Sequence, residues 1–268
     1  MNTMPIPGTT PANKGIQTKG SLYLVPAPLD FGCDDVQDLQ SCMPLGTIQA
    51  AASLQHWVCE NAKSTRAYLK RIAHIVPLCV SVQEMSLVEL PREVHKKGDH
   101  NGNFDARPLL QPALAGHNLG LISEAGMPAV ADPGSSVVRA AHAAGIPVVP
   151  LVGPSSLLLA LAASGLNGQN FAFTGYLPQD IQERAKRLQA LELLAQCSGQ
   201  TQLWIETPYR NQAVFDHALQ CLKPETRLCI AHGLTLPSMQ IQQASIAQWR
   251  KNRPTLPPKL PAVFALGV

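Results

Sequence analysis

The first half of the chain alternates between short apolar runs and amphipathic segments. Apolar, β-prone residues at 21–25, 119–123 and 146–150 predict strands of a buried sheet. Helical periodicity predicts helices over residues 57–73, 107–115, 133–144 and 157–164. Residues 47–52 fit either a strand or the end of a helix. This alternation of strands and helices is typical of a parallel sheet with right-handed crossovers.

Capping residues set the predicted ends of several helices. Asp132 is a suitable N-cap, Pro133 a suitable first helical residue, and Gly145 a suitable stop. Further along, Asp180 and Glu183 form a D-x-x-E pattern that predicts the start of another helix.

The second half has more closely spaced strands and follows a polar joint at 167–170, where we place a domain boundary. Its expected strands lie at 171–174, 202–206, 227–231, 239–243 and 262–266, and its expected helices begin at residues 181, 207 and 246. The sequence therefore predicts the α/β class with two α/β domains. They are an N-terminal domain over 21–168 with a mostly parallel sheet and a C-terminal domain over 169–268 with a mixed sheet. A disordered leader is expected over 1–20.

Composition narrows the class of protein. The 268 residues are 46% apolar and only 15% charged, which argues against a disordered tail or a coiled coil. The formal net charge of +3 does not by itself indicate nucleic-acid binding, although a local basic groove is compatible with it. The leader lacks the basic start and apolar core of a signal peptide. The longest apolar stretch, 148–166, is interrupted by Pro and Gly, so we expect no membrane span and a cytoplasmic location.

Cysteine usage agrees with a reducing compartment. The seven cysteines are odd in number and contain no C-x-x-C pair, so reduced, buried thiols are expected. They and the eight histidines show no zinc pattern, and we expect no metal site.

Three loops should meet at one edge of the predicted parallel sheet, because parallel strands end on the same side. They follow Val25, Ser123 and Pro150 and are rich in Gly, Pro and small residues, which allow the backbone to approach a ligand. Helix starts after Asp132 and Gly153 would favour an anionic group such as a carboxylate. No G-x-G-x-x-G, Walker or G-x-S-x-G pattern is present, so the loops alone leave the ligand open.

Two long motifs resemble the tetrapyrrole (corrin/porphyrin) methylase superfamily. They are Ser123-Glu-Ala-Gly-Met-Pro-Ala-Val-Ala-Asp-Pro-Gly134 with its continuation to Arg139, and Gly145-Ile-Pro-Val-Val-Pro-Leu-Val-Gly-Pro-Ser-Ser156. Within that superfamily, the chain is similar to the branch of ribosomal small-subunit RNA 2′-O-methyltransferases. The resemblance covers nearly the whole chain. It implies that S-adenosylmethionine (SAM) binds in a cleft between the two α/β domains of the chain. It also implies a homodimer, with ribosomal RNA or the small ribosomal subunit as partner.

The same resemblance implies site residues. The loop after the 119–123 strand would lie along the methionine and sulfonium part of SAM, and the loop after Pro150 would form a second cofactor loop. The implied cofactor-binding residues are Pro26, Gly126, Met127, Pro128, Val130, Gly153, Pro154, Ser155, Ser156, Glu206, Ala231, Pro261 and Ala262. Glu124 and Glu206 are the candidate catalytic carboxylates, although capping of backbone N–H groups explains each of them equally well.

Two segments depart from the RNA-methylating branch. Ala27-Pro-Leu-Asp-Phe-Gly-Cys-Asp34 stands where that branch has T-P-I-G-N-L-x-D, and Cys59-Glu-Asn-Ala-Lys-Ser-Thr-Arg66 replaces an E-D-T-R segment. Both lie on the substrate side, so SAM binding carries over better than RNA specificity. A methyltransferase acting on RNA, one acting on a small molecule such as a tetrapyrrole, and a non-catalytic SAM-fold binding protein are the three hypotheses.

Basic side chains supply candidate phosphate contacts for the first hypothesis. Lys63, Arg66 and Lys70 form one stripe on a predicted helix, for which a solvated flank is the simpler interpretation. The other candidates are Lys96, Lys97, Arg210, Arg250, Lys251 and Arg253.

Overall fold

The computed structural model describes residues 18–30, 33, 36–91, 93–94 and 104–268. Most of the predicted leader and the candidate phosphate contacts Lys96 and Lys97 lie outside the described residues.

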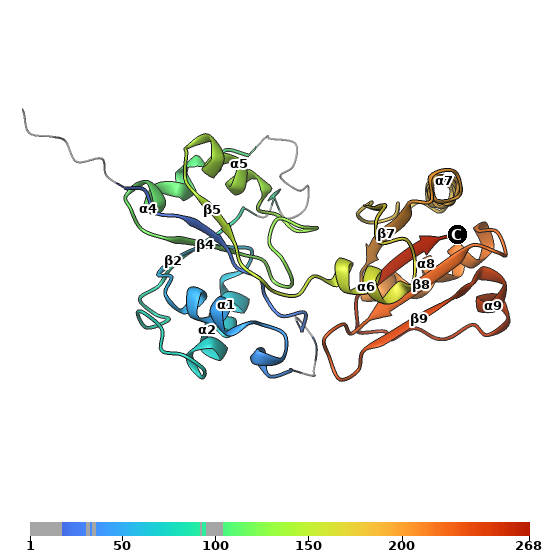
Figure 1. Cartoon of the computed structure of the whole chain (residues 1–268), viewed down its shortest axis with the longest axis horizontal. Helices are drawn as coiled ribbons and strands as arrows, with labels where there is room; N and C mark the ends of the chain where they lie inside the picture. Colours follow the sequence, from blue (N-terminus) through green and yellow to red (C-terminus); the bar gives the residue numbers. More distant parts are fainter. Residues whose placement is uncertain (1–17, 31–32, 34–35, 92, 95–103) are drawn as a thin grey trace, which may run out of the picture.

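Two α/β bodies lie side by side, joined by the segment that follows the fifth strand (Figure 1). The first body contains a five-stranded sheet in the order β3-β2-β4-β1-β5, and all its neighbouring strands are parallel. Its strands are β1 Leu22–Leu24, β2 His56–Cys59, β3 Ser86–Glu89, β4 Leu119–Ile122 and β5 Val148–Pro150. The predicted parallel N-terminal sheet is therefore confirmed.

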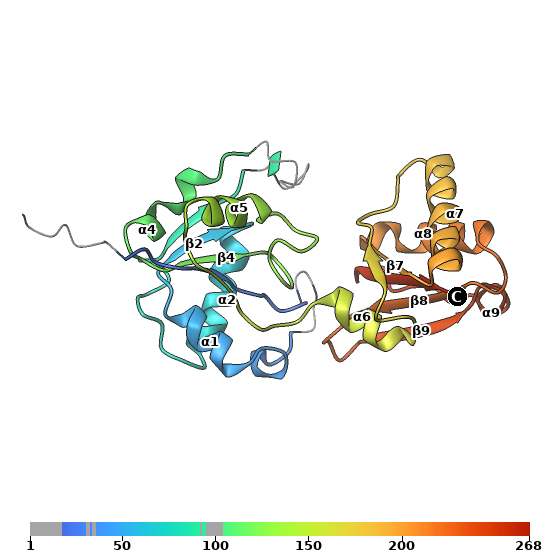
Figure 2. The same ribbon diagram turned by 45° about the horizontal axis from the view of Figure 1, so that its top comes forward.

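Helices cover both faces of this sheet (Figure 2). Alternate residues of β2 show why: Trp57 and Cys59 pack with the helices on one face, and Val58 packs with those on the other. The first face carries η1 Leu39–Ser41, α1 Leu45–Ala52 and α2 Ala62–Ala73, and the second carries η2 Arg107–Leu110, α4 Gln111–Leu114 and α5 Ser135–Ala143. The undecided segment 47–52 is thus helical.

The predicted helix over 57–73 is wrong at its start. Residues 57–59 belong to β2, which pairs with β3 on one side and β4 on the other. Helix α2 begins only after Asn61, whose side chain accepts hydrogen bonds from the backbone N–H groups of Lys63 and Ser64. Val58 fits the helical spacing by coincidence, and sheet pairing outweighs that pattern.

The predicted N-cap at Asp132 is also wrong. Helix α5 begins at Ser135, and its N-cap is Gly134 with φ of +129°. Asp132 and Pro133 therefore belong to the preceding loop, and the Asp132 side chain is not used to cap a helix.

The second body contains a five-stranded sheet that is mixed, as predicted, and its strand order is β6-β7-β10-β8-β9. Only the β6–β7 pair is parallel. The strands are β6 Phe171–Phe173, β7 Thr201–Glu206, β8 Arg227–His232, β9 Gln240–Ser245 and β10 Ala262–Gly267.

One face of this sheet packs on α6 Ser156–Ser164, through Leu203 and Val263 among others. The other face, with the stacked rings of Trp204 and Phe264, packs on α7 Ile181–Ser198, α8 Pro208–Cys221 and α9 Ile246–Lys251. Asp180 caps α7 as expected, because its carboxylate accepts from the N–H groups of Gln182 and Glu183. The chain passes from one sheet to the other between β5 and β6. The domain boundary placed at residue 168 falls in that interval and stays a prediction.

All seven cysteines lie in the described part of the chain and none forms a disulfide. Cys59 and Cys229 are buried, whereas Cys79 and Cys197 are exposed, so the expectation of buried thiols is wrong for those two. Among the described residues, none of the helices combines the length and the apolar character needed to cross a membrane.

Close packing at the centre of the first sheet gives a stability prediction. A Cβ added at Gly120 in β4 would lie 2.5 Å from Cε3 of the buried Trp57 ring. We expect Gly120→Ala to lower the free energy of unfolding by about 2–4 kcal/mol in urea denaturation, because a fully packed core must shift.

Gly46 in α1 provides the matched control, since a Cβ there meets nothing within 4 Å. Gly46→Ala should be neutral or stabilise by up to about 1 kcal/mol. Equal effects of the two substitutions would contradict the packing assigned to Gly120.

Candidate functional site

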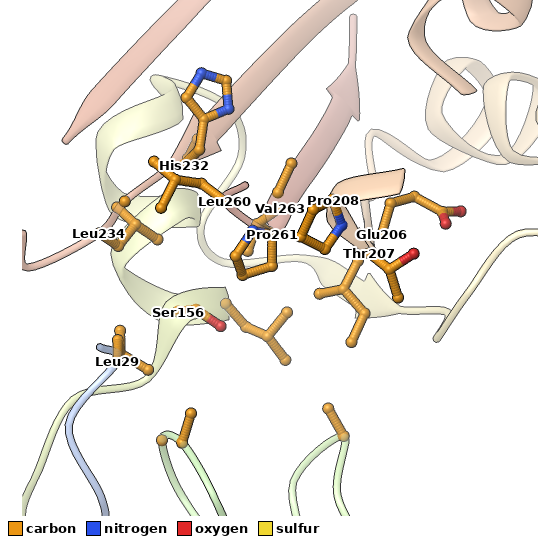
Figure 3. Close-up of a pocket in the computed structure, with 18 of the residues that line it drawn as sticks. Leu29, Ser156, Glu206, Thr207, Pro208, His232, Leu234, Leu260, Pro261 and Val263 are labelled. Atoms are coloured by element: carbon orange, nitrogen blue, oxygen red, sulfur yellow. The ribbon is translucent and has the colours of Figure 1, made fainter. Parts of the chain in front are cut away.

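A cavity of about 570 Å³ lies between the two bodies and is lined by residues of both. Figure 3 shows Leu29 of the loop after β1 on one side, with Ser156 from the start of α6 and Val263 from β10 farther in. Its walls are mainly apolar, and a few polar side chains reach it. This composition is typical of a small-molecule site.

A backbone bridge joins the first two loops that border the cavity. The N–H of Ala27 donates to the carbonyl of Gly126, and the N–H of Gly126 donates to the carbonyl of Ala27, both at 2.9 Å. Gly126 has φ of +70°, a conformation that glycine adopts without strain. A Cβ there would lie 3.4 Å from Leu29 Cδ2, so the bridge also brings Leu29 close to the second loop.

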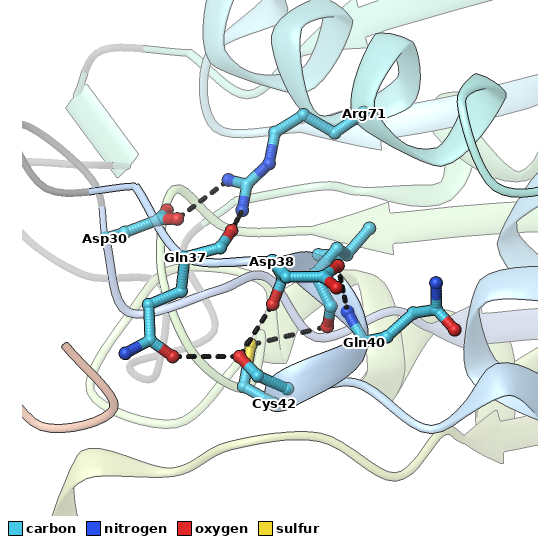
Figure 4. Close-up of polar contacts among 8 residues, drawn as sticks. Asp30, Gln37, Asp38, Gln40, Cys42 and Arg71 are labelled. Carbon is cyan, nitrogen blue, oxygen red and sulfur yellow. Dashed lines mark hydrogen bonds and ion pairs between the residues drawn. The ribbon is translucent and has the colours of Figure 1, made fainter. Parts of the chain in front are cut away.

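Polar contacts from α2 fix the loop after β1 (Figure 4). The guanidinium of Arg71 pairs with Asp30 at 2.8 Å and donates to the carbonyl of Gln37 at 2.9 Å. The hydroxyl of Tyr68 donates to the carbonyl of Pro26 at 3.2 Å. One helix therefore contacts this loop at Pro26, Asp30 and Gln37.

The third loop packs directly on the first. A Cβ added at Gly153 would lie 2.3 Å from Cγ of Pro26, so only glycine fits at this position. Thr47 in α1 donates to the carbonyl of Val152 at 2.7 Å. Beyond Gly153, Ser155 and Ser156 line the cavity.

The structure brings most of the predicted cofactor residues to this cavity. Nine of them line it: Gly126, Met127, Val130, Ser155, Ser156, Glu206, Ala231, Pro261 and Ala262. Four do not appear in its lining, namely Pro26, Pro128, Gly153 and Pro154. Of these, Pro26 and Gly153 pack against each other and hold two of the loops together.

Glu206, one of the two predicted catalytic carboxylates, is occupied by structural contacts. It is 1% exposed, accepts from the N–H of Leu177 at 3.3 Å and pairs with Arg210 at 3.3 Å. Burial raises the pKa of Glu206, and the guanidinium of Arg210 opposes that shift. In Figure 3 its carboxylate points away from the cavity.

Glu124, the other predicted catalytic carboxylate, does not line the cavity. It lies just after β4, where it accepts from the hydroxyl of Ser64 at 3.3 Å. Its own backbone N–H donates to the carboxylate of Glu60 at 3.1 Å. These contacts join the ends of β2 and β4 to the start of α2.

Asp132 and Tyr176 are among the titratable residues of the cavity that sequence reasoning missed. Burial, together with the nearby carboxylates of Glu60 and Glu124, raises the pKa of Asp132 to about 7. Burial also raises the pKa of Tyr176, and so do the carboxylates of Asp132, Glu206 and Glu60. Asp132 has the sequence pattern of an N-cap, and no local pattern indicates the extended loop.

Further missed lining residues come from the second body. Ile205, Leu234 and Val263 contribute apolar surface, and Tyr209, which is 95% exposed, stands at the rim. His232 is buried, its ring points away from the cavity in Figure 3, and burial lowers its pKa. These residues lie at or near strand ends, except Tyr209 at the start of α8, and local sequence patterns do not encode where these segments lie relative to the first body.

The volume of the cavity and the groups that line it fit a molecule such as SAM. The cavity volume falls within the range of about 300–1,000 Å³ that small-molecule sites occupy. Lys259 at the rim offers an ammonium to a carboxylate, and the apolar wall suits a purine. No group of three or more His, Cys, Asp or Glu that could hold a metal ion is found in the described part of the chain.

Comparison with known sequences identifies the family. The sequence profile of the Tetrapyrrole (Corrin/Porphyrin) Methylases matches residues 47–249. The chain belongs to the tetrapyrrole methylase family. It is accordingly a SAM-dependent methyltransferase by family membership, and its cofactor is SAM.

Relatives of this tetrapyrrole methylase include proteins named ribosomal RNA small subunit methyltransferase I. That of Vibrio cholerae is 33% identical over 150 residues, which cover 56% of this chain and 51% of the relative. That of Streptococcus pyogenes serotype M1 is 29% identical over 238 residues, which cover 88% of this chain and 72% of the relative. That of Mesorhizobium japonicum is 32% identical over 215 residues, covering 80% and 64%. The matches thus span about half to three quarters of the relatives' own lengths.

Solved structures agree on the fold. The methyltransferase CobJ superposes with a TM-score of 0.56 at 17% identity, over 92% of this chain and 94% of that one. The uroporphyrin-III C-methyltransferase of Thermus thermophilus, complexed with S-adenosylhomocysteine, gives a TM-score of 0.51 at 18% identity, over 92% and 97%.

The raised pKa of Asp132 gives a stability prediction with a defined sign. The unfolded carboxyl ionises near pH 3.9, whereas the folded one ionises near pH 7. The folded state thus binds a proton more strongly, and its stability falls as the pH rises from about 4 to about 7. Asp132→Asn removes this loss. We expect the gain in unfolding free energy over wild type to be larger at pH 8 than at pH 5 by about 1–3 kcal/mol.

Thermal and urea unfolding at the two pH values measure this difference. Glu225→Gln, which changes an exposed carboxyl in the second body, is the control. Its effect on the unfolding free energy should be the same at both pH values. A gain from Asp132→Asn that does not change with pH would contradict the shifted ionisation.

Proposed function

We propose that this tetrapyrrole methylase transfers a methyl group from SAM to RNA, with a ribose 2′-hydroxyl of ribosomal small-subunit RNA as acceptor. One observation carries the proposal: relatives named ribosomal RNA small subunit methyltransferase I align through both bodies, in one case over 88% of the chain. Because the alignment includes both bodies, it includes both walls of the cavity.

The exposed basic stripe on α2 supports an RNA acceptor. Lys63, Arg66 and Lys70 are all exposed, and α2 begins beside Glu124, close to the loop that borders the cavity. Phosphate contacts from such a stripe would position an RNA strand near the site.

Three other basic candidates are engaged within the protein. Arg210 donates to the carbonyl of Leu177 at 2.7 Å, Arg250 donates to the carbonyls of Leu219 and Leu222, and Arg253 pairs with Asp216. Their guanidinium groups help to hold the second body together, so α2 is the better candidate for phosphate contacts.

The loop residues Gly126, Met127 and Val130 are proposed to hold the methionine part of the cofactor, and Ala231, Pro261 and Ala262 the adenosine part. When bound, SAM supplies a methyl group already activated on a sulfonium. The protein therefore has to orient the acceptor and exclude water. The apolar wall around Ile205 and Val263 is suited to excluding water.

A homodimer and a cytoplasmic location remain predictions from the family resemblance and the sequence. A small-molecule acceptor such as a tetrapyrrole remains the second candidate, because the altered segments 27–34 and 59–66 lie on the substrate side.

The cofactor assignment predicts the effect of filling the cavity at Gly126. Calorimetric titration of wild type with SAM should give micromolar binding, and Gly126→Leu should weaken it at least about 100-fold by occupying the methionine site. Gly126→Ala has the same positive-φ backbone cost without the bulk and should weaken binding less. Gly168→Leu, at an open surface position, should leave the affinity unchanged. Equal affinities for wild type and Gly126→Leu would contradict the assignment.

The RNA assignment predicts a charge-dependent acceptor interaction. Methyl transfer is measured with tritiated SAM and 30S ribosomal subunits. The double variant Lys63→Gln, Arg66→Gln should raise KM for the acceptor about 10-fold and change no other step, because phosphate contacts are lost. Its affinity for SAM should not change. Lys186→Gln on α7 removes an exposed charge from the other body and serves as the control. Transfer to a small-molecule extract but not to RNA would support the tetrapyrrole-type acceptor, and no transfer at all would support the non-catalytic hypothesis.

A further inference from the structure

Asp132 is the one carboxyl of the cavity lining that has no polar partner among the described residues. It is half-buried and lines the cavity, yet no hydrogen bond or ion pair joins it to any part of the chain that the structure describes. Glu206 differs, because its oxygens are held by Leu177 and Arg210. A half-buried carboxylate without a partner is costly and points to a role toward a bound molecule.

The backbone around Asp132 is held in an unusual conformation. Ala129 and Ala131 have φ of +64° and +65°, in the left-handed region that alanine rarely adopts, and Gly134 has φ of +129°. Such strain is typical of functional loops. Here it extends the loop, so that α5 begins two residues beyond Pro133 and the Asp132 side chain is free to face the cavity.

Asp132 also faces the opposite body. Its carboxylate raises the pKa of Tyr176, which follows β6 and lines the cavity from the far side. Asp132 therefore lines the cavity between the two bodies, whereas Glu124 lies outside the cavity lining.

We propose that Asp132 is the general base that accepts the proton of the acceptor hydroxyl, which rests on the proposed function above. The hydroxyl oxygen forms a bond to the methyl carbon, and the sulfur–methyl bond breaks with its electron pair remaining on sulfur. The hydroxyl proton passes to a carboxylate oxygen of Asp132. The products are the methyl ether, S-adenosylhomocysteine and a neutral Asp132.

Neighbouring charges adjust Asp132 to this role. Burial, together with the carboxylates of Glu60 after β2 and Glu124 after β4, raises its pKa to about 7. From the second body, the titratable or charged side chains that line the cavity are those of Tyr176, Glu206, Tyr209, His232 and Lys259, and Arg210 pairs with Glu206. A base with a pKa near neutrality combines an adequate ionised fraction with the greatest proton affinity at that pH.

Substitution of Asp132 tests the proposal. With tritiated SAM and 30S subunits under single-turnover conditions, Asp132→Asn should slow methyl transfer about 100-fold or more, while its calorimetric Kd for SAM stays within about threefold of wild type. Asp132→Glu, which keeps the carboxylate, should recover part of the rate. Glu225→Gln, at an exposed site in the second body, should match wild type in both measurements.

A pH profile separates a base from a merely structural residue. The wild-type rate constant should rise with pH to a midpoint near 7 and then level off. Glu60→Gln retains an oxygen that can accept from the N–H of Glu124 but removes the negative charge, so it should move the midpoint down by about 0.5 unit. Potentiometric titration gives a readout independent of activity: between pH 9 and pH 5 wild type should take up one proton more than Asp132→Asn.

The outcomes distinguish the two proposals. Equal transfer rates for wild type and Asp132→Asn, or a midpoint unmoved by Glu60→Gln, would overturn the general base and leave the RNA acceptor standing. Absence of transfer to 30S subunits by the wild-type protein would overturn the proposed acceptor and this assignment with it.

Discussion

The parallel pairing of β1 with β4 on one side and β5 on the other is the constraint on which the site depends. Parallel neighbours end at the same edge of a sheet, so loops that begin nearly 130 residues apart in the sequence meet there. Contacts among these loops then complete the first wall of the cavity: the backbone bridge between Ala27 and Gly126, and the packing of Pro26 on Gly153. The second sheet needs only to face this edge to close the site.

Much of this arrangement could be predicted from the sequence, because local patterns encode it. The apolar runs, the Gly- and Pro-rich loops after them and the Asp180 cap identified the α/β class and both sheets. The nine lining residues were identified by the family resemblance that the two long motifs carry. The errors fall where tertiary contacts outweigh local pattern. Trp57 belongs to a strand because β3 and β4 flank it, and Asp132 lies in a loop because Ala129 and Ala131 adopt left-handed backbone conformations. Neither the pairing nor the positive φ values leave a sequence signal.

The carboxylates near the cavity show that environment, and not residue type, separates their roles. Glu206 and Glu124 have structural partners, one in the second body and one at the start of α2. Glu60 and Glu124 add negative charge near Asp132, which has no such partner among the described residues. Acidic residues that look alike in the sequence thus have different roles, according to what surrounds each one. One makes structural contacts, others add negative charge, and one is a candidate proton acceptor.

The bridge between Ala27 and Gly126 uses only backbone N–H and carbonyl groups, and this has an evolutionary consequence. Side chains of the segment 27–34 can be replaced without breaking either hydrogen bond, so this loop can change while the geometry of the neighbouring loop is preserved. Selection can therefore alter the residues of one loop independently of the other. The residues of this chain at 27–34 differ from the motif of the RNA-methylating branch, whereas its loop at 123–134 carries the long motif that resembles the family, which is the pattern that this independence would leave.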